Sequence, residues 1–375
     1  MCYVKDKKEN DLLDNYREKL VWPNQINSES VVIHNDIDGV LSGLYLLNKG
    51  AAIVGMYDLE RFHFTNKQEK NRFDHHVYVD LDIDYREVRS FGHHIIANLN
   101  KNAFNLNHVF NLDADFGKLF TNKCPLNTII LLYALYDQKP QTDEEIAFLV
   151  YADSVILNFE KYKQNMTNWL RVLGQDEILD ALENRIDNLY RIIDELIKPA
   201  LEVSYPFYEH KQNLNGDIRK YTQCNHFIDF KNKTFTSDIT PIFKLSKELL
   251  NLNSEGFPIK FLESIKYVKN YKMVYDQEED LYKKENIVTK FDSSRIKNFQ
   301  KALKEVKKYI VSHSFTYSDA VQLTLDQDVE MEFNEETQKI TVKDKDETLK
   351  IQNMTIIIDE NGKLRGYQKK SRLKG

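Results

Sequence analysis

The stretch that decides the fold is Val31-Val32-Ile33-His34-Asn35-Asp36-Ile37-Asp38-Gly39. Its β-branched apolar beginning is typical of a buried strand, and the polar residues that follow end the strand. Residues 40–47 then have the apolar spacing of a helix, which Gly50 closes. The stretch therefore predicts a buried strand, a tight turn and a helix.

Three side chains that bind metals, His34, Asp36 and Asp38, stand at the C-terminal end of this strand. Open α/β sheets bind their ligands at that end of their strands. Two carboxylates in one turn repel each other, and a divalent cation relieves the repulsion. In a simpler interpretation, Asp38 caps the helix and binds nothing. Because Asp-x-Asp-Gly is a short motif, both interpretations stay open on this stretch alone.

The composition is that of a globular protein. A chain of 375 residues allows two domains and a large core, and 29% charged with 12% aromatic residues argues against disorder. The net charge is -6, so nucleic-acid binding requires a local basic groove. Three cysteines without a Cys-x-x-Cys pair argue against a disulfide framework or a zinc ribbon and favour a reducing cytoplasm. Without a run of about 18 apolar residues or an apolar N-terminal core, we expect neither a membrane span nor a signal peptide.

Strands and helices are expected to alternate along the first half of the chain, which predicts a parallel sheet. Beyond about residue 205 the pattern weakens, and the last fifty residues favour β-hairpins. We expect an α/β protein with a catalytic domain over 1–160, connector helices over 161–205 and a smaller α+β domain over 206–375. The expected strands are 51–57, 77–83 and 88–94, and the expected helices are 126–137, 143–157, a long amphipathic one over 182–196, 241–251 and 293–312.

Further polar side chains follow these strands and helices. They are Asp80 (with Asp82), the pair His93 and His94, and Asp153. Carboxylate and imidazole together suit Mn²⁺, Fe²⁺ or Zn²⁺, whereas Mg²⁺ usually prefers oxygen ligands. Two such ions bridged by a shared carboxylate would activate a water and stabilise phosphoryl transfer. The sequence contains no Walker loop, Gly-x-Gly-x-x-Gly or Gly-x-Ser-x-Gly motif.

In combination, these residues resemble the DHH phosphoesterases, a family named for an Asp-His-His motif. Residues 34–39 are similar to the family's first motif in its RecJ-type form, Asp-x-Asp-x-Asp-Gly, with His34 at the first acidic position. Val79-Asp80-Leu81-Asp82 resembles the second motif, whose Asp bridges both metals, and Ala152-Asp153 resembles the fourth. The resemblance covers about residues 30–160.

Two histidine pairs compete for the third motif. A literal Asp74-His75-His76 occurs, but it precedes the strand over 77–83 and would lie at the wrong edge of the sheet. Gly92-His93-His94 keeps the family's order but lacks the acidic residue whose hydrogen bond usually orients the first histidine. We favour His93 and His94. The alternative register takes Asp58 as the second motif and Asp74-His75-His76 as the third.

The resemblance implies a hydrolase that cleaves phosphodiesters with two Mn²⁺ ions, or with Mg²⁺. The favoured substrate is single-stranded DNA, digested as by RecJ-type exonucleases, with the basic stretches 297–308 and 369–374 following its backbone. Alternatives are short oligoribonucleotides or cyclic dinucleotides, or a catalytically silent binding protein. The family's Gly-Gly-rich substrate loop is not found after residue 205, which leaves the substrate open. By resemblance the metal ligands would be His34, Asp36, Asp38, Asp80, His93 and Asp153, and the catalytic residues His93, His94, which would contact the scissile phosphate, and His34.

Overall fold

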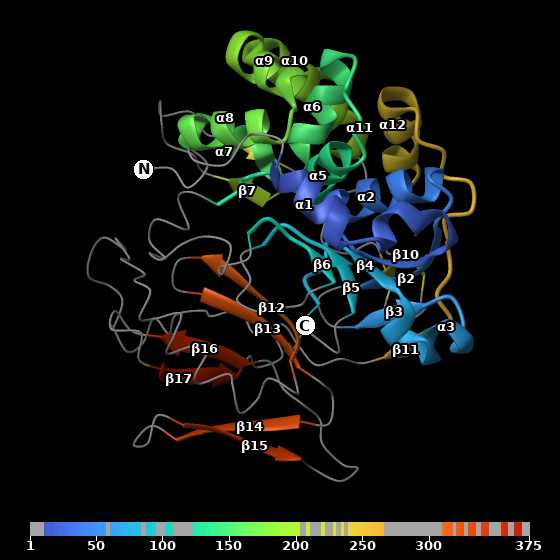
Figure 1. The fold of residues 1–375 in the computed structure, drawn as a ribbon, viewed down its shortest axis with the longest axis vertical. Coiled ribbons are helices and arrows are strands. Elements are labelled where there is room, and N and C mark those ends of the chain that lie inside the picture. The colour runs from blue at the N-terminus through green and yellow to red at the C-terminus, as the bar shows by residue number, and fades with distance from the viewer. Residues whose placement is uncertain are drawn as a thin grey trace.

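A computed structural model describes six segments, with the side chains of most of their residues: 11–57, 61–83, 88–94, 102–107, 123–202 and 239–265. Further strands between residues 208 and 369 are described by their backbone. A seven-stranded sheet, in the order β11-β3-β2-β1-β4-β5-β6, lies below most of the helices in the view of Figure 1. The parallel strands are β2 (Ala52–Tyr57), β1 (Ser30–His34), β4 (Val77–Val79), β5 (Arg89–Phe91) and β6 (Ala103–Phe104), and the antiparallel ones at one edge are β3 (Phe62–Phe64) and β11 (Glu263–Ile265).

The register of the parallel strands aligns their C-terminal ends. Ile33, Val79, Phe91 and Phe104 are successive partners across β1, β4, β5 and β6. The residues that follow them, among them His34 and Asp80, therefore leave the sheet at one edge. The predicted strand, turn and helix are confirmed, because β1 runs into α2 (Ile37–Asn48) and Val31, Val32 and Ile33 are fully buried.

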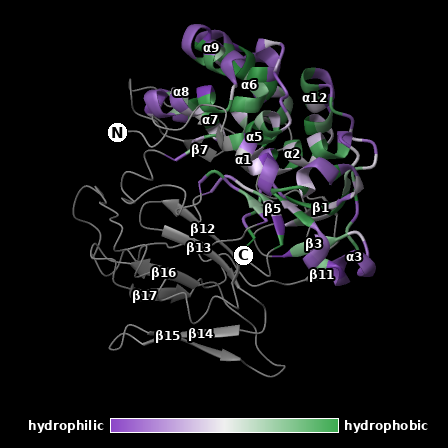
Figure 2. Ribbon diagram, viewed as in Figure 1, coloured by the Kyte–Doolittle hydropathy of each residue, from purple (hydrophilic) through white to green (hydrophobic). Residues whose placement is uncertain are grey.

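Helices cover the sheet and carry much of the core. Figure 1 shows α5 to α11 gathered on the side of the sheet where α2 lies, and Figure 2 shows that apolar residues dominate α5 and the buried parts of α6. Every residue of α5 is buried, so this helix needs no polar face. The helices are α1 (Asp11–Lys19), α2, α3 (Lys67–Asn71), α5 (Thr128–Leu135), α6 (Asp143–Tyr151), α7 (Val155–Lys161), α8 (Lys163–Val172), α9 (Asp176–Asn184), α10 (Ile186–Ile192), α11 (Lys198–Glu202) and α12 (Thr240–Leu250), with shorter turns η2 (Trp22–Ser28), η3 (Phe73–His75), η5 (Ala152–Ser154) and η6 (Ile193–Ile197).

The long helix expected over 182–196 is interrupted. Helix α9 ends before Arg185, whose backbone (φ -135°, ψ 22°) is not helical, and α10 then runs into a π-helical turn, η6. The Arg185 guanidinium binds the carboxylates of Asp143 and Asp180, which holds the break in place. The apolar stripe continues across the break, so its spacing could not reveal it.

The boundary expected at residue 206 does not separate the described segments. Helix α12 packs against α6 and α11, and β11 pairs with β3 as the edge strand of the central sheet. Residues 239–265 therefore belong to the same body as the first half of the chain. The reason is local: a three-residue strand and an amphipathic helix do not indicate in sequence which layer they join.

The described C-terminal strands form hairpins, as expected. The helix expected over 293–312 is wrong at its end, because β12 begins at Ile310; residues 293–309 lie outside the described residues. Strand propensity explains the difference, since Ile310 and Val311 are β-branched. The paired strands are β7 (Tyr208–His210) with β8 (Arg219–Tyr221), β9 (Ile228–Asp229) with β10 (Thr234–Phe235), β12 (Ile310–Tyr317) with β13 (Ala320–Leu325), β14 (Val329–Asn334) with β15 (Lys339–Asp344), and β16 (Met354–Ile358) with β17 (Leu364–Lys369).

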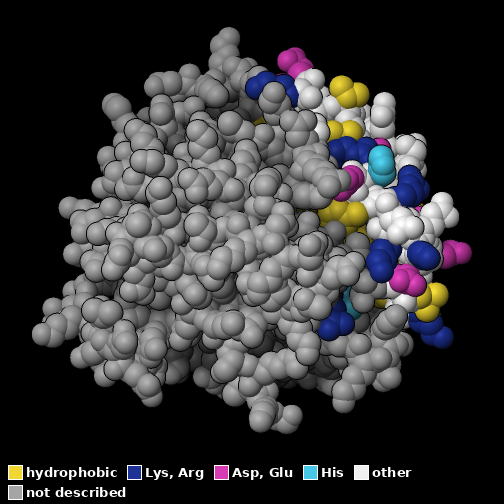
Figure 3. All heavy atoms as spheres, turned by 90° about the horizontal axis from the view of Figure 1, so that it is seen from below, with side chains coloured by type: hydrophobic (Ala, Val, Ile, Leu, Met, Phe, Trp, Pro, Cys, Tyr) yellow, Lys and Arg dark blue, Asp and Glu magenta, His cyan; other side chains and the backbone are white. Residues whose placement is uncertain are grey.

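Neither expected basic path can be followed in the structure. Residues 297–308 lie outside the described residues, as do residues 370–374. On the described part of the face in Figure 3, Lys and Arg side chains stand among Asp, Glu and apolar side chains. Among the described residues, no helix is long and apolar enough to cross a membrane.

Candidate metal centre

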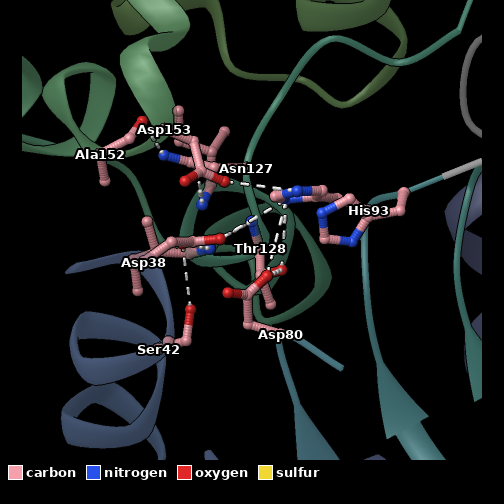
Figure 4. Close-up of polar contacts among 12 residues, drawn as sticks. Asp38, Ser42, Asp80, His93, Asn127, Thr128, Ala152 and Asp153 are labelled. Atoms are coloured by element: carbon pink, nitrogen blue, oxygen red, sulfur yellow. Dashed lines mark hydrogen bonds and ion pairs between the residues drawn. The ribbon is translucent and has the colours of Figure 1, made fainter. Parts of the chain in front are cut away.

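The polar residues at the C-terminal edge of the sheet form one cluster (Figure 4). Ligand atoms of Asp38, Asp80, His93 and Asp153 all lie within 4.8 Å of one another. His34, Asp36 and Asp80 form a second group by the same distance, and Asp80, His93 and His94 a third. Asp80 belongs to all three. The structure therefore brings together every residue that the sequence singled out as a metal ligand.

The turn after β1 gives its two carboxylates different tasks. Asp36 caps α2 by accepting a hydrogen bond from Gly39 N at 2.8 Å, so the capping role considered for Asp38 falls to Asp36. The fully buried Asp38 instead accepts hydrogen bonds from Thr128 N at 2.7 Å and Ile129 N at 2.9 Å. These two amides open α5, and the positive end of its dipole favours a carboxylate there.

Asp80 follows β4 directly and is held in a left-handed backbone conformation, with φ 58°. Its Oδ1 accepts a hydrogen bond from Thr128 Oγ1 at 2.9 Å. Its Oδ2 is buried without a hydrogen-bond partner among the described residues, and His34 Nδ1 lies 3.3 Å away. A strained backbone and an unsatisfied buried oxygen both cost stability, and such costs concentrate at functional sites.

His93 lies between carboxylates from three different elements. Its Nδ1 is 3.5 Å from Asp38 Oδ2 and 3.8 Å from Asp80 Oδ1, and its Nε2 is 3.3 Å from Asp153 Oδ2. Asn107 donates a hydrogen bond to the His93 carbonyl, which fixes the backbone at this position. The imidazole thus contacts the carboxylates with both ring nitrogens.

Asp153 lies at a break between helices rather than inside the helix expected over 143–157. Helix α6 ends at Tyr151, and Asp153 and Ser154 have φ values of 54° and 55° before α7 begins. The break turns the Asp153 carboxylate toward His93, as Figure 4 shows. Periodicity could not predict it, because apolar residues continue on both sides.

Asn127 holds this break against the N-terminus of α5. Its Oδ1 accepts from Ile130 N, and its Nδ2 donates to the carbonyls of Leu149 (2.8 Å) and Ala152 (2.9 Å). Thr128 follows, with bonds to both Asp38 and Asp80. Asn127 and Thr128 are not among the site residues predicted from the sequence, although Asn-Thr before an apolar run is a helix-start pattern that could have indicated them.

Replacing Asn127 by alanine should lower the free energy of unfolding by about 2–4 kcal/mol, because two buried carbonyls and one amide lose their partner. Asn66→Ala is the matched control, since Asn66 caps the exposed helix α3 through one bond to Glu69 N. We expect about 1 kcal/mol there. Urea unfolding of both variants measures the difference, and equal losses would contradict this account of Asn127.

The competing histidine pair lies at the opposite end of β4. Asp74 and His75 belong to η3, and His76 immediately precedes Val77. The ring of His76 is fully buried, with Nε2 2.8 Å from the carbonyl of Glu69. Asp58, which the alternative register needs, lies outside the described residues. The geometry therefore favours Gly92-His93-His94 as the pair beside the other polar residues.

The pKa values of Asp80, Asp153 and His93 are all raised above their ordinary values. Burial, with Asp36 and Asp38 adding to it, raises the pKa of Asp80 well above its ordinary value. Burial also raises the pKa of Asp153 to about 7, although His93 opposes the shift. Burial acts to lower the pKa of His93, but its carboxylate neighbours outweigh burial and raise it to about 10.

The pair His34 and Asp36 behaves as an ion pair, with Nδ1 2.7 Å from Oδ2. Burial alone would raise the pKa of Asp36, but His34 outweighs it and lowers the pKa to about 2. Burial alone would lower the pKa of His34, and Asp36 outweighs it in the other direction. Both shifts show that the attraction between the His34 ring and the Asp36 carboxylate outweighs the cost of burying them.

This cluster fits divalent cations. Its donors are carboxylate oxygens and imidazole nitrogens, which suit Mn²⁺, Fe²⁺ or Zn²⁺. The buried Oδ2 of Asp80 lacks a hydrogen-bond donor in the described part of the chain, and a cation would satisfy it. Bound cations would also offset the repulsion between the crowded carboxylates.

Binding of Mn²⁺ at pH 8 should release the proton of His93, because this histidine, with a pKa of about 10, must lose its proton to become a ligand. At pH 6, Asp153 also carries a proton, so release should increase and affinity should fall. Calorimetric titrations in buffers of different ionisation enthalpy measure this directly. A binding heat that is independent of the buffer would contradict it, and His93→Ala should remove the release at pH 8.

Comparison with protein-family models, curated proteins and solved structures finds no match for this chain. Any function must therefore be argued from the chemistry of this cluster.

Proposed function

We propose that this chain is a metal-dependent phosphodiesterase that uses two divalent cations, as its resemblance to the DHH phosphoesterases implies. The observation that carries the proposal is the position of Asp80, whose carboxylate belongs to groups of donors on both of its sides. His34, Asp36 and Asp80 would hold one cation. Asp38, Asp80, His93 and Asp153 would hold the other.

The cations, when bound, would activate a water and offset the charge that develops on the phosphate, so no protein nucleophile is required. The chain's own residues keep this arrangement rigid. The amides of α5 hold Asp38, and the Thr128 hydroxyl holds Asp80. His94 is partly exposed beside the cluster, and we propose that it contacts the scissile phosphate.

Within this class we propose single-stranded DNA as the substrate, digested from an end. The RecJ-type form of residues 34–39 supports this choice, with His34 in place of the first acidic residue. The cluster itself acts only on the phosphate, so surfaces that contact the neighbouring nucleotides must select the substrate.

A panel assay with Mn²⁺ tests the proposal. Labelled single-stranded DNA, short RNA and cyclic dinucleotides are incubated with the protein, and product lengths are resolved. We expect stepwise shortening of DNA, loss of activity with a chelator, and rates on DNA that fall steeply with salt through counterion release. Faster, salt-insensitive cleavage of the small substrates would assign the site to them instead. Absence of hydrolysis with every substrate would leave a binding protein.

A further inference from the structure

A second carboxylate and histidine pair lies beside the cluster, formed by Asp82 and His94. His94 Nδ1 lies 3.0 Å from Asp82 Oδ2. The Asp82 side chain is 1% exposed, whereas that of His94 is 36% exposed. A ring nitrogen of His94 is also within 4.8 Å of ligand atoms of Asp80 and His93. His94 therefore contacts a buried carboxylate and also lies beside the cluster.

Gly92 leaves the space that the Asp82 carboxylate occupies. A Cβ atom at position 92 would lie within 2.8 Å of Cγ, Oδ1 and Oδ2 of Asp82, so a side chain there and this carboxylate exclude each other. Position 92 is where the literal order Asp-His-His would place its acid. Here residue 92 has no side chain, and the carboxylate of Asp82, which follows the neighbouring strand β4, occupies the space.

Asn105 orients the Asp82 carboxylate. Its Nδ2 donates to Asp82 Oδ1 and to the His94 carbonyl, the latter at 2.9 Å, and its Oδ1 accepts from Asn107 N at 2.6 Å. These partners fix the orientation of the Asn105 side-chain amide. The His94 carbonyl requires a donor, which is Nδ2 of Asn105, and Asn107 N–H requires an acceptor, which is Oδ1 of Asn105. Asp82 Oδ2 faces Nδ1 of His94.

We propose that Asp82, whose carboxylate fills the space beside Gly92, is the positioning residue for His94, the second histidine of the pair. This proposal rests on the proposed phosphodiesterase function. Because a carboxylate only accepts, the neutral His94 ring carries its proton on Nδ1, and Nε2 is left free for the phosphate or a cation. Asp82 thus selects the tautomer of His94 and holds the ring in place.

The test is Asp82→Asn, which preserves the shape of the side chain. The fixed Asn105 amide donates toward position 82, so the oxygen of the introduced amide must face Asn105 and its NH₂ group must face His94. His94 Nδ1 then becomes an acceptor, and the proton moves to Nε2. We expect kcat to fall on the order of 10³–10⁴-fold, as for loss of an orienting acid, with KM changed much less.

Nitrogen-detected NMR of the metal-free, ¹⁵N-histidine-labelled protein reports the tautomer without any activity, with His94→Ala used to assign the signal. The control is Asn107→Ala, which removes bonds to the carbonyls of His93 and Cys124 but none to the His94 ring. It should lower Tm and leave the His94 nitrogen shifts unchanged.

The proposal is overturned if Asp82→Asn leaves the proton on Nδ1, or if the proton moves and kcat does not fall. A wild-type protein that cleaves no substrate removes the proposed phosphodiesterase function and, with it, the catalytic meaning of Asp82. The NMR comparison then still decides whether Asp82 selects the tautomer, so the two failures are distinguishable.

Discussion

Replacement of Asp80 by asparagine is expected to abolish Mn²⁺-dependent hydrolysis and, at the same time, to make the metal-free protein more stable. The loss of activity should exceed about 10³-fold, because Asp80 belongs to every group of donors and an amide is a much poorer metal ligand. The gain in stability also comes from the position of Asp80 among buried carboxylates. Burial, Asp36 and Asp38 raise the pKa of the Asp80 carboxyl, so its ionised form destabilises the fold increasingly as pH rises above about 4.

Thermal unfolding with a chelator at pH 8 and activity with Mn²⁺ measure the two effects. Each kcal/mol gained should raise Tm by about 2–4 °C. The Thr128 hydroxyl can still donate to the amide oxygen, so the variant should fold. Asp74→Asn, an exposed acid at the other end of β4, is the control and should change neither quantity. Full activity in Asp80→Asn would end the proposal of two bridged cations.

The double variant His93→Ala/His94→Ala is expected to lose metal-dependent hydrolysis, with more than a hundredfold loss of kcat. The comparison variant, His75→Ala/His76→Ala, should keep most of the metal-dependent hydrolysis. The reason is position: His93 contacts Asp38, Asp80 and Asp153, whereas His75 and His76 precede β4 at the opposite edge of the sheet.

Stability separates a lost site from a lost fold in this comparison. His76 is fully buried and bonds the Glu69 carbonyl, so its removal should cost about 1–3 kcal/mol of unfolding free energy. Removal of His93 also destabilises the metal-free protein, because Asp38, Asp80 and Asp153 lose the charge that balances them. Both variants should still unfold in one cooperative transition, which shows that any difference in activity comes from the site and not from the fold. The opposite pattern of activity would move the site to Asp74-His75-His76.

The chain revealed part of this architecture directly. An uninterrupted β-branched run that ends in polar residues and meets a helical pattern can form only a few structures, so β1, its turn and α2 were predictable. Parallel pairing then brought His34, Asp80 and His93 to one edge without further information. The remaining contacts depend on the folded chain. The two carbonyls that Asn127 binds lie more than 20 residues away, and the break at Asp153 is held by those bonds.

The role of Asp82 was hidden for a related reason. In sequence it is the neighbour of Asp80, and Gly92 looks like a missing acid. Only the close approach of the Asp82 carboxylate to position 92 shows why a glycine stands there.

The pairing of β11 with β3 has a consequence for the order in which the protein can form. The two strands are separated by about 200 residues, yet β3 has β11 as its outer neighbour. A growing chain must therefore reach residue 265 before β3 is covered, and until then β3 presents unpaired amides and carbonyls to other chains. Fragments that end near residue 205 should aggregate during synthesis, whereas those that extend beyond 265 can complete the edge.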